Sequence, residues 1–163
     1  MRHVVGLSSA KDQELRWPLD VENRMRFDSG HFQTLGYFRL LALAFDHYAQ
    51  RDARIGISSI NVMFYLDGED LVATLEILLR LENEIADMPE RWKTFLGTVQ
   101  YPGRQPKRIE PLLFKRRAMA LLGSLRALTQ KAMDQGKMVV YGNGVCYRYL
   151  CGIKLPPGTV EYS

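Results

Sequence analysis

No apolar stretch of this sequence is long enough to cross a membrane. The longest uninterrupted run, Leu40 to Phe45, has six residues, whereas a transmembrane helix needs about 20. Residues 1–10 also lack the long apolar segment and the cleavage site of a secretory signal peptide. These absences predict a cytoplasmic protein that has no membrane partner.

Cysteine and histidine are scarce. Cys146 and Cys151 are the two cysteines, and the default state of both in a reducing compartment is the free thiol. Their odd separation would also point them to opposite faces of a shared strand. The histidines His3, His31 and His47 are widely dispersed, so we expect no structural metal site.

The sequence also lacks the common catalytic and cofactor-binding motifs. It contains neither a Gly-x-Ser-x-Gly nucleophile turn nor a phosphate-binding loop that ends in Lys-Ser/Thr. The glycine-containing segment 142–144 is too short for a dinucleotide-binding loop and reads as a turn. The acids Asp67, Glu69 and Asp70 lack the spacing of a calcium loop and fit a helix N-terminus better. We therefore expect a non-enzymatic protein with no cofactor and no catalytic residues.

What is present is typical of a soluble globular protein. Of the 163 residues, 47% are hydrophobic and 25% are charged, which is ordinary for such proteins. The length fits one domain that covers residues 1–163. Within it, residues 101–108 contain two prolines and a glycine and predict an exposed basic loop.

Apolar periodicity and end signals predict three main helices, which cover about 32–50, 67–87 and 111–135. Pro111 suits the first turn of the last helix, and Gly136 suits its C-cap. Leu41 and Leu122 fall on the apolar faces, so both are expected in the core. Residues 20–27 fit one or two helical turns. Pro89 is expected to open a further short helix that carries Trp92 and Phe95.

Alternation and turn residues predict a small amount of strand. Residues 57–66 alternate with period two. Residues 137–141 and 145–150 flank the turn at 142–144 and predict a C-terminal hairpin. The predicted fold class is therefore α+β: a mostly helical single domain with a small antiparallel sheet that includes the C-terminal hairpin.

The net charge of +4 is distributed unevenly along the chain. Residues 67–90 hold one basic and eight acidic residues, whereas residues 91–163 hold 13 basic and three acidic ones. Two interpretations remain open at this point. The basic half suits a polyanionic partner, or the acidic and basic segments face each other, either within one chain or between the copies of a homodimer.

Two basic stretches are the candidate nucleic-acid-binding sites. The first combines the predicted loop with the start of the following helix, a pattern suited to phosphate backbones. The second is the predicted hairpin, where Tyr141, Tyr147 and Tyr149 surround a cation and predict stacking on bases. The cations of both stretches are Arg104, Lys107, Arg108, Lys115, Arg116, Arg117 and Arg148.

We therefore predict a non-enzymatic nucleic-acid-binding or regulatory accessory protein that acts through its basic C-terminal half. The partner is DNA or RNA, and the sequence leaves that choice open. The alternative is a protein-binding module, such as an inhibitor, immunity or adaptor protein, that docks on a partner through its acidic helix at 67–90.

Overall fold

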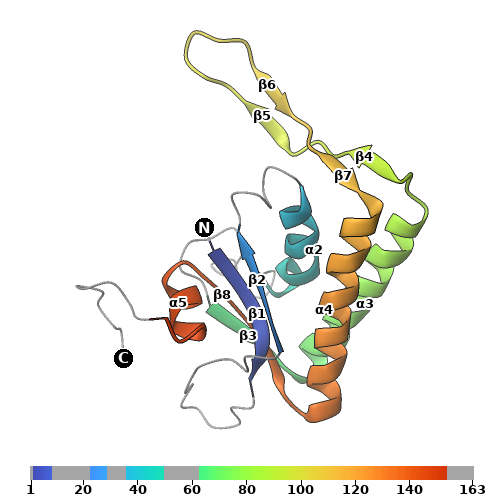
Figure 1. Cartoon of the computed structure of the whole chain (residues 1–163), viewed down its shortest axis with the longest axis vertical. Coiled ribbons are helices and arrows are strands. Elements are labelled where there is room, and N and C mark those ends of the chain that lie inside the picture. Colours follow the sequence, from blue (N-terminus) through green and yellow to red (C-terminus); the bar gives the residue numbers. More distant parts are fainter. Residues whose placement is uncertain (1, 9–22, 29–35, 50–62, 154–163) are drawn as a thin grey trace.

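The protein is described by a computed structural model, which defines residues 2–8, 23–28, 36–49 and 63–153 (Figure 1). Across these residues it is an α+β protein with four helices and three antiparallel sheets. The helices are α2 (Tyr37–Ala49), α3 (Gly68–Ala86), α4 (Lys115–Gln135) and α5 (Val145–Leu150). The strands are β1 (Arg2–Ser8), β2 (Arg24–Asp28), β3 (Met63–Leu66), β4 (Arg91–Lys93), β5 (Gly97–Val99), β6 (Lys107–Ile109), β7 (Leu112–Phe114) and β8 (Met138–Asn143).

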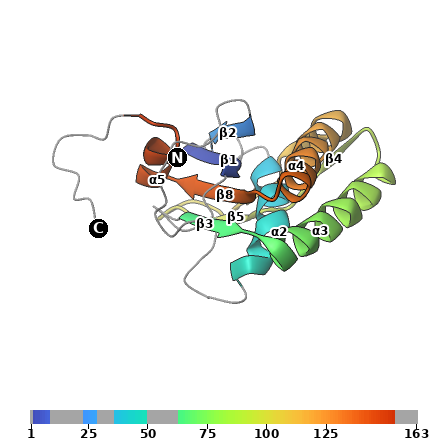
Figure 2. The ribbon, with the colours of Figure 1, turned by 90° about the horizontal axis from the view of Figure 1, so that it is seen from below.

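The largest sheet has four strands in the order β2-β1-β8-β3, and all its pairs are antiparallel. Helices cover both of its faces (Figure 2). On one face Val5 and Val139 join a core that α2, α3 and α4 complete. On the other face Val4 and Val140 pack against α5. Because β1 and β8 are covered on both sides, their sequences are apolar almost throughout instead of alternating.

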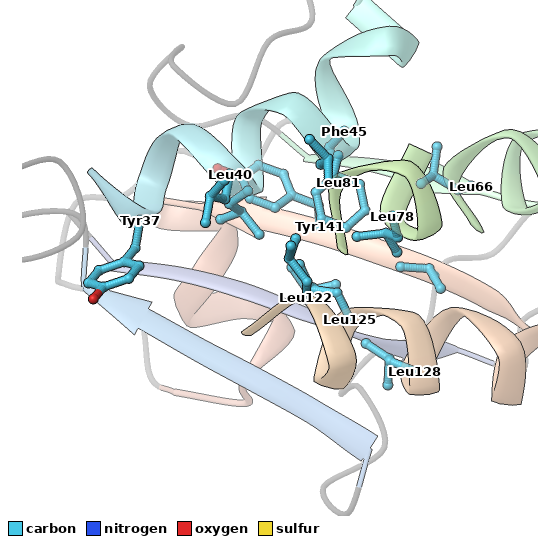
Figure 3. Close-up of a cluster of buried hydrophobic side chains, with 14 of the residues drawn as sticks. Tyr37, Leu40, Phe45, Leu66, Leu78, Leu81, Leu122, Leu125, Leu128 and Tyr141 are labelled. Carbon is cyan, nitrogen blue, oxygen red and sulfur yellow. The ribbon is translucent and has the colours of Figure 1, made fainter. Parts of the chain in front are cut away.

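The main core lies between this sheet and the three longer helices (Figure 3). Leu41 and Leu122 are both fully buried in it, as the apolar faces predict. Tyr141 of β8 lies at its centre, where its ring stacks on Phe64 at a centroid distance of 4.9 Å. Aromatic pairs of this kind add stability beyond the area that they bury.

The predicted helix ends are largely confirmed. Asp67 is the N-cap residue of α3, and Glu69 lies in its first turn, where the helix dipole favours acids. Gly136 ends α4 in the left-handed conformation, with φ of 61°. The described parts of the other two predicted segments form α2 and β3, while residues 32–35, 50 and 57–62 lie outside the described residues.

The predicted C-terminal hairpin is wrong. Residues 145–150 form α5, and β8 pairs with β1 and β3 instead. Both hydrogen-bonding edges of β8 are therefore occupied, and a strand at 145–150 would have no edge to join. Gly144, with φ of 58°, turns the chain out of the sheet at this point.

Three local helix predictions are also wrong, because strand pairing overrides the local signals. Residues 91–93 form β4 instead of a helix that follows Pro89. Residues 112–114 form β7, its partner, so α4 begins at Lys115 and not at Pro111. Residues 24–28 form β2 on the edge of β1.

Candidate nucleic-acid interface

The chain between α3 and α4 forms a two-stranded ribbon that projects beyond the helices (Figure 1). We call residues 91–114 the arm. In its lower part β4 pairs with β7, and in its upper part β5 pairs with β6. Two backbone hydrogen bonds connect the two strands of the arm where these parts meet. One runs from Thr94 N–H to the Pro111 carbonyl at 3.1 Å, and the other from Leu96 N–H to the Ile109 carbonyl at 2.9 Å.

One extra residue separates the two parts of the arm. Lys93 faces Leu112, and Gly97 faces Ile109, so three residues on the first strand oppose two on the second. This is the pattern of a β-bulge, which bends a ribbon and increases its twist. Pro111 lies in the shorter segment, where its missing N–H removes no hydrogen bond that the ladder needs.

The base of the arm is fixed to α2. The hydroxyl of Tyr37 accepts a 3.0 Å hydrogen bond from the backbone N–H of Phe114. Arg39 donates one of 3.3 Å to the carbonyl of Phe95. Gly36 allows the close approach, because a Cβ there would lie 2.7 Å from Cδ1 of the fully buried Leu113. The arm therefore leaves the body in a defined direction.

The structure brings six of the seven predicted cations to the arm and its junction with α4, and four of these six are exposed without a salt bridge. Arg104 and Lys107 lie near the tip, and Arg116 and Arg117 lie in the first turn of α4. All four are exposed, and none makes a salt bridge within the described part of the chain. Every residue of the predicted loop, 101–108, is exposed, although its last two residues belong to β6.

Arg108 is also on the arm, but its guanidinium is already engaged. It donates a 3.0 Å hydrogen bond to Glu110 and lies 4.4 Å from the ring centroid of Phe95. The hydrogen bond to Glu110 raises the pKa of Arg108, and the same bond lowers the pKa of the Glu110 carboxyl. Arg108 is therefore less available to a phosphate than its neighbours.

Lys115 has a structural role. Its Nζ donates hydrogen bonds to the carbonyls of Ala86, at 2.6 Å, and Met88, at 3.0 Å. The last turn of α3 has no basic residue of its own, so Lys115 supplies the cation that favours a helix C-terminus. This contact accounts for a lysine at the start of α4.

Arg116 and Arg117 have no comparable explanation in helix stability. The positive end of the helix dipole disfavours cations in the first turn, and α4 has no acid there to offset them. Arg117 lies 5.8 Å from the ring centroid of Phe114, and both arginines are exposed. A bound anion would convert this unfavourable arrangement into a favourable one.

Arg148 does not join this group. It lies on α5, across the four-stranded sheet from α3 and α4 (Figure 2). The base-stacking prediction for this region is wrong, because Tyr141 is fully buried and Tyr147 is 5% exposed. The side chain of Tyr149 lies outside the described residues.

Sequence reasoning missed three residues of the arm. Arg91 and Lys93 are exposed on β4 on either side of the half-buried Trp92, and an alternation of three residues is too short to signal a strand. Tyr101 is 56% exposed at the tip. The proline-rich composition of its segment indicated a loop but gave no sign of the ribbon that carries it.

The acidic segment lies beside the basic helix. Helices α3 and α4 run side by side (Figure 1), and Arg126 donates a 2.7 Å hydrogen bond to Glu82 in a salt bridge between them. Part of the acidic segment therefore faces the basic one within a single chain. The cations of the arm lie away from this contact.

A cluster of three polar side chains is buried beneath α2. His3 Nδ1 lies 2.6 Å from the hydroxyl of Tyr141, and Asn143 donates a 3.1 Å hydrogen bond to the same oxygen. All three residues are completely buried, so His3 is a core histidine. In the part of the chain that the structure defines, no three His, Cys, Asp or Glu residues are grouped so that they could hold a metal ion.

Comparison with models of known protein families, with curated proteins and with solved structures found no match. Within residues 2–8, 23–28, 36–49 and 63–153, none of the helices combines the length and the apolarity that a membrane span requires.

The two cysteines are free thiols, as the sequence predicts. Both lie in or just after α5 and are partly buried. Burial raises the pKa of the Cys146 thiol, which reduces the thiolate fraction at any given pH.

Alkylation without a reductant should therefore modify both cysteines, with Cys146 reacting more slowly in the folded protein than in the urea-unfolded chain. The pH at which Cys146 becomes reactive should be higher in the folded protein, because the raised pKa keeps the thiol protonated further into the alkaline range. Peptide mass spectrometry after timed quenching measures both rates. A pair that alkylates only after reduction would contradict the free-thiol assignment.

Proposed function

We propose that this protein is a non-enzymatic nucleic-acid-binding protein that acts through the arm and the first turn of α4. The observation that carries the proposal is the group Arg104, Lys107, Arg116 and Arg117. These cations are exposed, lack salt-bridge partners among the described residues, and lie on a ribbon that projects from the body.

The dimensions of the arm suit a phosphate backbone. At about 3.3 Å per residue, the strand from Lys107 to the start of α4 spans roughly 25 Å. That length corresponds to about seven base-pair steps of 3.4 Å along the axis of a DNA duplex. The arm therefore places separated cations along one stretch of nucleic acid.

The test is the salt dependence of binding. We expect the full chain to bind a short fluorescein-labelled duplex, with an affinity that falls steeply as salt rises from about 50 to 200 mM. Changing Arg104, Lys107, Arg116 and Arg117 together to Gln should lower the affinity about 10⁴-fold at about 50 mM salt. It should also reduce the slope of log K against log salt by about 3.6, since each lost phosphate contact contributes about 0.9. Fluorescence anisotropy measures both quantities, and circular dichroism checks the fold.

A matched pair of variants separates the arm from overall charge. Arg104→Gln/Lys107→Gln and Arg80→Gln/Lys131→Gln each remove two positive charges, the second pair from exposed positions on α3 and α4. Only the arm pair should reduce the salt slope, by about 2. Equal losses in the two variants would count against the arm, and an absence of salt-dependent binding by the unmodified chain would reject the proposal.

One observation favours the alternative, a protein-binding module that docks through the acidic helix. Val72 and Leu79 are 44% and 43% exposed on α3, with the exposed Glu76 between them. Purification from the native host with and without nuclease distinguishes the two functions. If the alternative is correct, a partner protein should co-purify with the chain whether or not nuclease is added. The variant Val72→Lys/Leu79→Lys should no longer bind that partner, whereas the arm variants should still bind it.

A further inference from the structure

The tip of the arm contains a β-turn. The backbone N–H of Arg104 donates a 3.1 Å hydrogen bond to the carbonyl of Tyr101, which closes a four-residue β-turn. Pro102 occupies its second position, and Gly103, with φ of 74°, occupies its third. This is the residue pattern of a type II turn, in which proline fixes one φ angle and glycine supplies the positive one.

This turn presents an apolar surface between cations. Tyr101 is 56% exposed, and Pro102 beside it is also exposed. Arg104 follows in the same turn, and Lys107 begins β6. The loop between β5 and β6, which is the outer end of the arm in Figure 1, therefore combines an aromatic ring and a proline ring with Arg104, and Lys107 follows at the start of β6.

Tyr101 differs from the other exposed aromatic residues of the arm. Arginines lie over Phe95 and Phe114, at 4.4 and 5.8 Å from the ring centroids. No ring contact or cation–π contact involves Tyr101 within the described residues. The arm thus offers one uncovered ring at its end and not a series of rings along its length. Single-strand binding proteins stack successive bases on several aromatic side chains, whereas one apolar tip suits insertion at a single base step.

The ribbon beneath the tip can support such an insertion. The base of the arm is held by the hydrogen bond that Phe114 donates to Tyr37, by the one that Arg39 donates to the arm, and by the buried side chain of Leu113. Inserting between base pairs requires that the base step be unstacked, and an arm whose base is already held need not be ordered first. A freely jointed loop would have to be ordered at the moment of binding.

We propose that Tyr101 and Pro102 enter the minor groove of duplex DNA, insert between two base pairs and bend the duplex. Arg104 and Lys107 contact the phosphates that border the groove. This inference rests on the proposed nucleic-acid-binding function, and it adds the kind of nucleic acid and the effect on its shape. In this proposal the arm contacts the phosphates through its cations and also inserts Tyr101 and Pro102 between base pairs as a wedge.

The experiment measures bending and affinity separately. A DNA duplex labelled at its two ends with a donor and an acceptor dye should show higher energy transfer when the full chain binds. Tyr101→Ser should abolish that increase and lower the affinity about tenfold, which is the usual scale for one lost stacking contact. Its salt slope should remain that of the unmodified chain, because the substitution removes no positively charged side chain.

Two further variants control for a general loss of structure. Tyr101→Phe retains the ring and should retain bending. Tyr65→Ser removes a tyrosine that is 45% exposed on the edge strand β3, away from the arm, and should leave bending and affinity unchanged. Circular dichroism should show that all three variants keep their secondary structure.

The failure of this inference is distinguishable from the failure of the proposed function. If the unmodified chain shows no salt-dependent binding, both are rejected. If it binds but the energy transfer does not rise, or Tyr101→Ser behaves like Tyr65→Ser, the wedge is rejected and the electrostatic function stands. If Tyr101→Ser weakens binding to a single strand but leaves duplex binding and bending intact, stacking on unpaired bases replaces the wedge.

Discussion

Leu122→Ala should lower the free energy of unfolding by about 2–5 kcal/mol, the range for buried leucines. Leu122 is fully buried on α4, and Figure 3 shows it in the core among Leu125, Tyr141 and Leu78. Truncation removes apolar contacts and leaves a cavity that the sheet and two neighbouring helices can fill only partly. Urea denaturation followed by circular dichroism measures the change.

The matched control is Leu79→Ala on the neighbouring helix α3. Leu79 is 43% exposed, so the same truncation there should cost less than about 1 kcal/mol. A loss at Leu122 no larger than that at Leu79 would mean that the assignment of the α4 face to the core is wrong.

Gly142→Ala should also destabilise the protein, by about 1–3 kcal/mol, because α5 packs directly on this glycine. A Cβ at position 142 would overlap Cδ1 of Leu150 and would lie 3.4 Å from the Cβ of Cys146. Leu150 is completely buried and has little space into which it can move. Leu150→Ala alone should cost about 2–5 kcal/mol through the cavity that it leaves.

The double variant tests the contact itself. Gly142→Ala/Leu150→Ala should cost less than the sum of the two single changes, because removing the leucine side chain makes room for the new methyl group. Gly123→Ala provides the control for the substitution. It lies inside α4, its added Cβ would have one neighbour at 3.7 Å, and it should be stabilising by about 0.5–1 kcal/mol. Additive costs at 142 and 150 would show that α5 does not pack on β8.

The sequence determined the elements whose signals are local. The apolar stripe and Asp67 at one end were sufficient for α3, and the stripe and Gly136 were sufficient for most of α4. Their periodicity follows from the geometry of the helix itself, so it needs no knowledge of the partners. The same is true of the basic candidates Arg104, Lys107, Arg116 and Arg117, since charged side chains in polar segments are generally exposed.

Tertiary structure decided the elements that depend on distant partners. Residues 91–93 became a strand because residues 112–114 lie opposite them, and residues 145–150 became a helix because β1 and β3 already occupy both edges of β8. Strand pairing joins residues far apart in the chain, and no local pattern records which edge is free.

For the candidate site, too, the sequence indicated some features and only the tertiary structure showed the others. The sequence indicated a basic stretch, but only the folded chain showed that Lys115 caps α3, that Arg108 is engaged by Glu110, and that Arg148 lies across the sheet from the others. It also placed Tyr101 at the end of a fixed ribbon. Composition specifies which charges are present, whereas packing and pairing specify which of them remain exposed together, because each contact that engages a cation comes from another part of the chain.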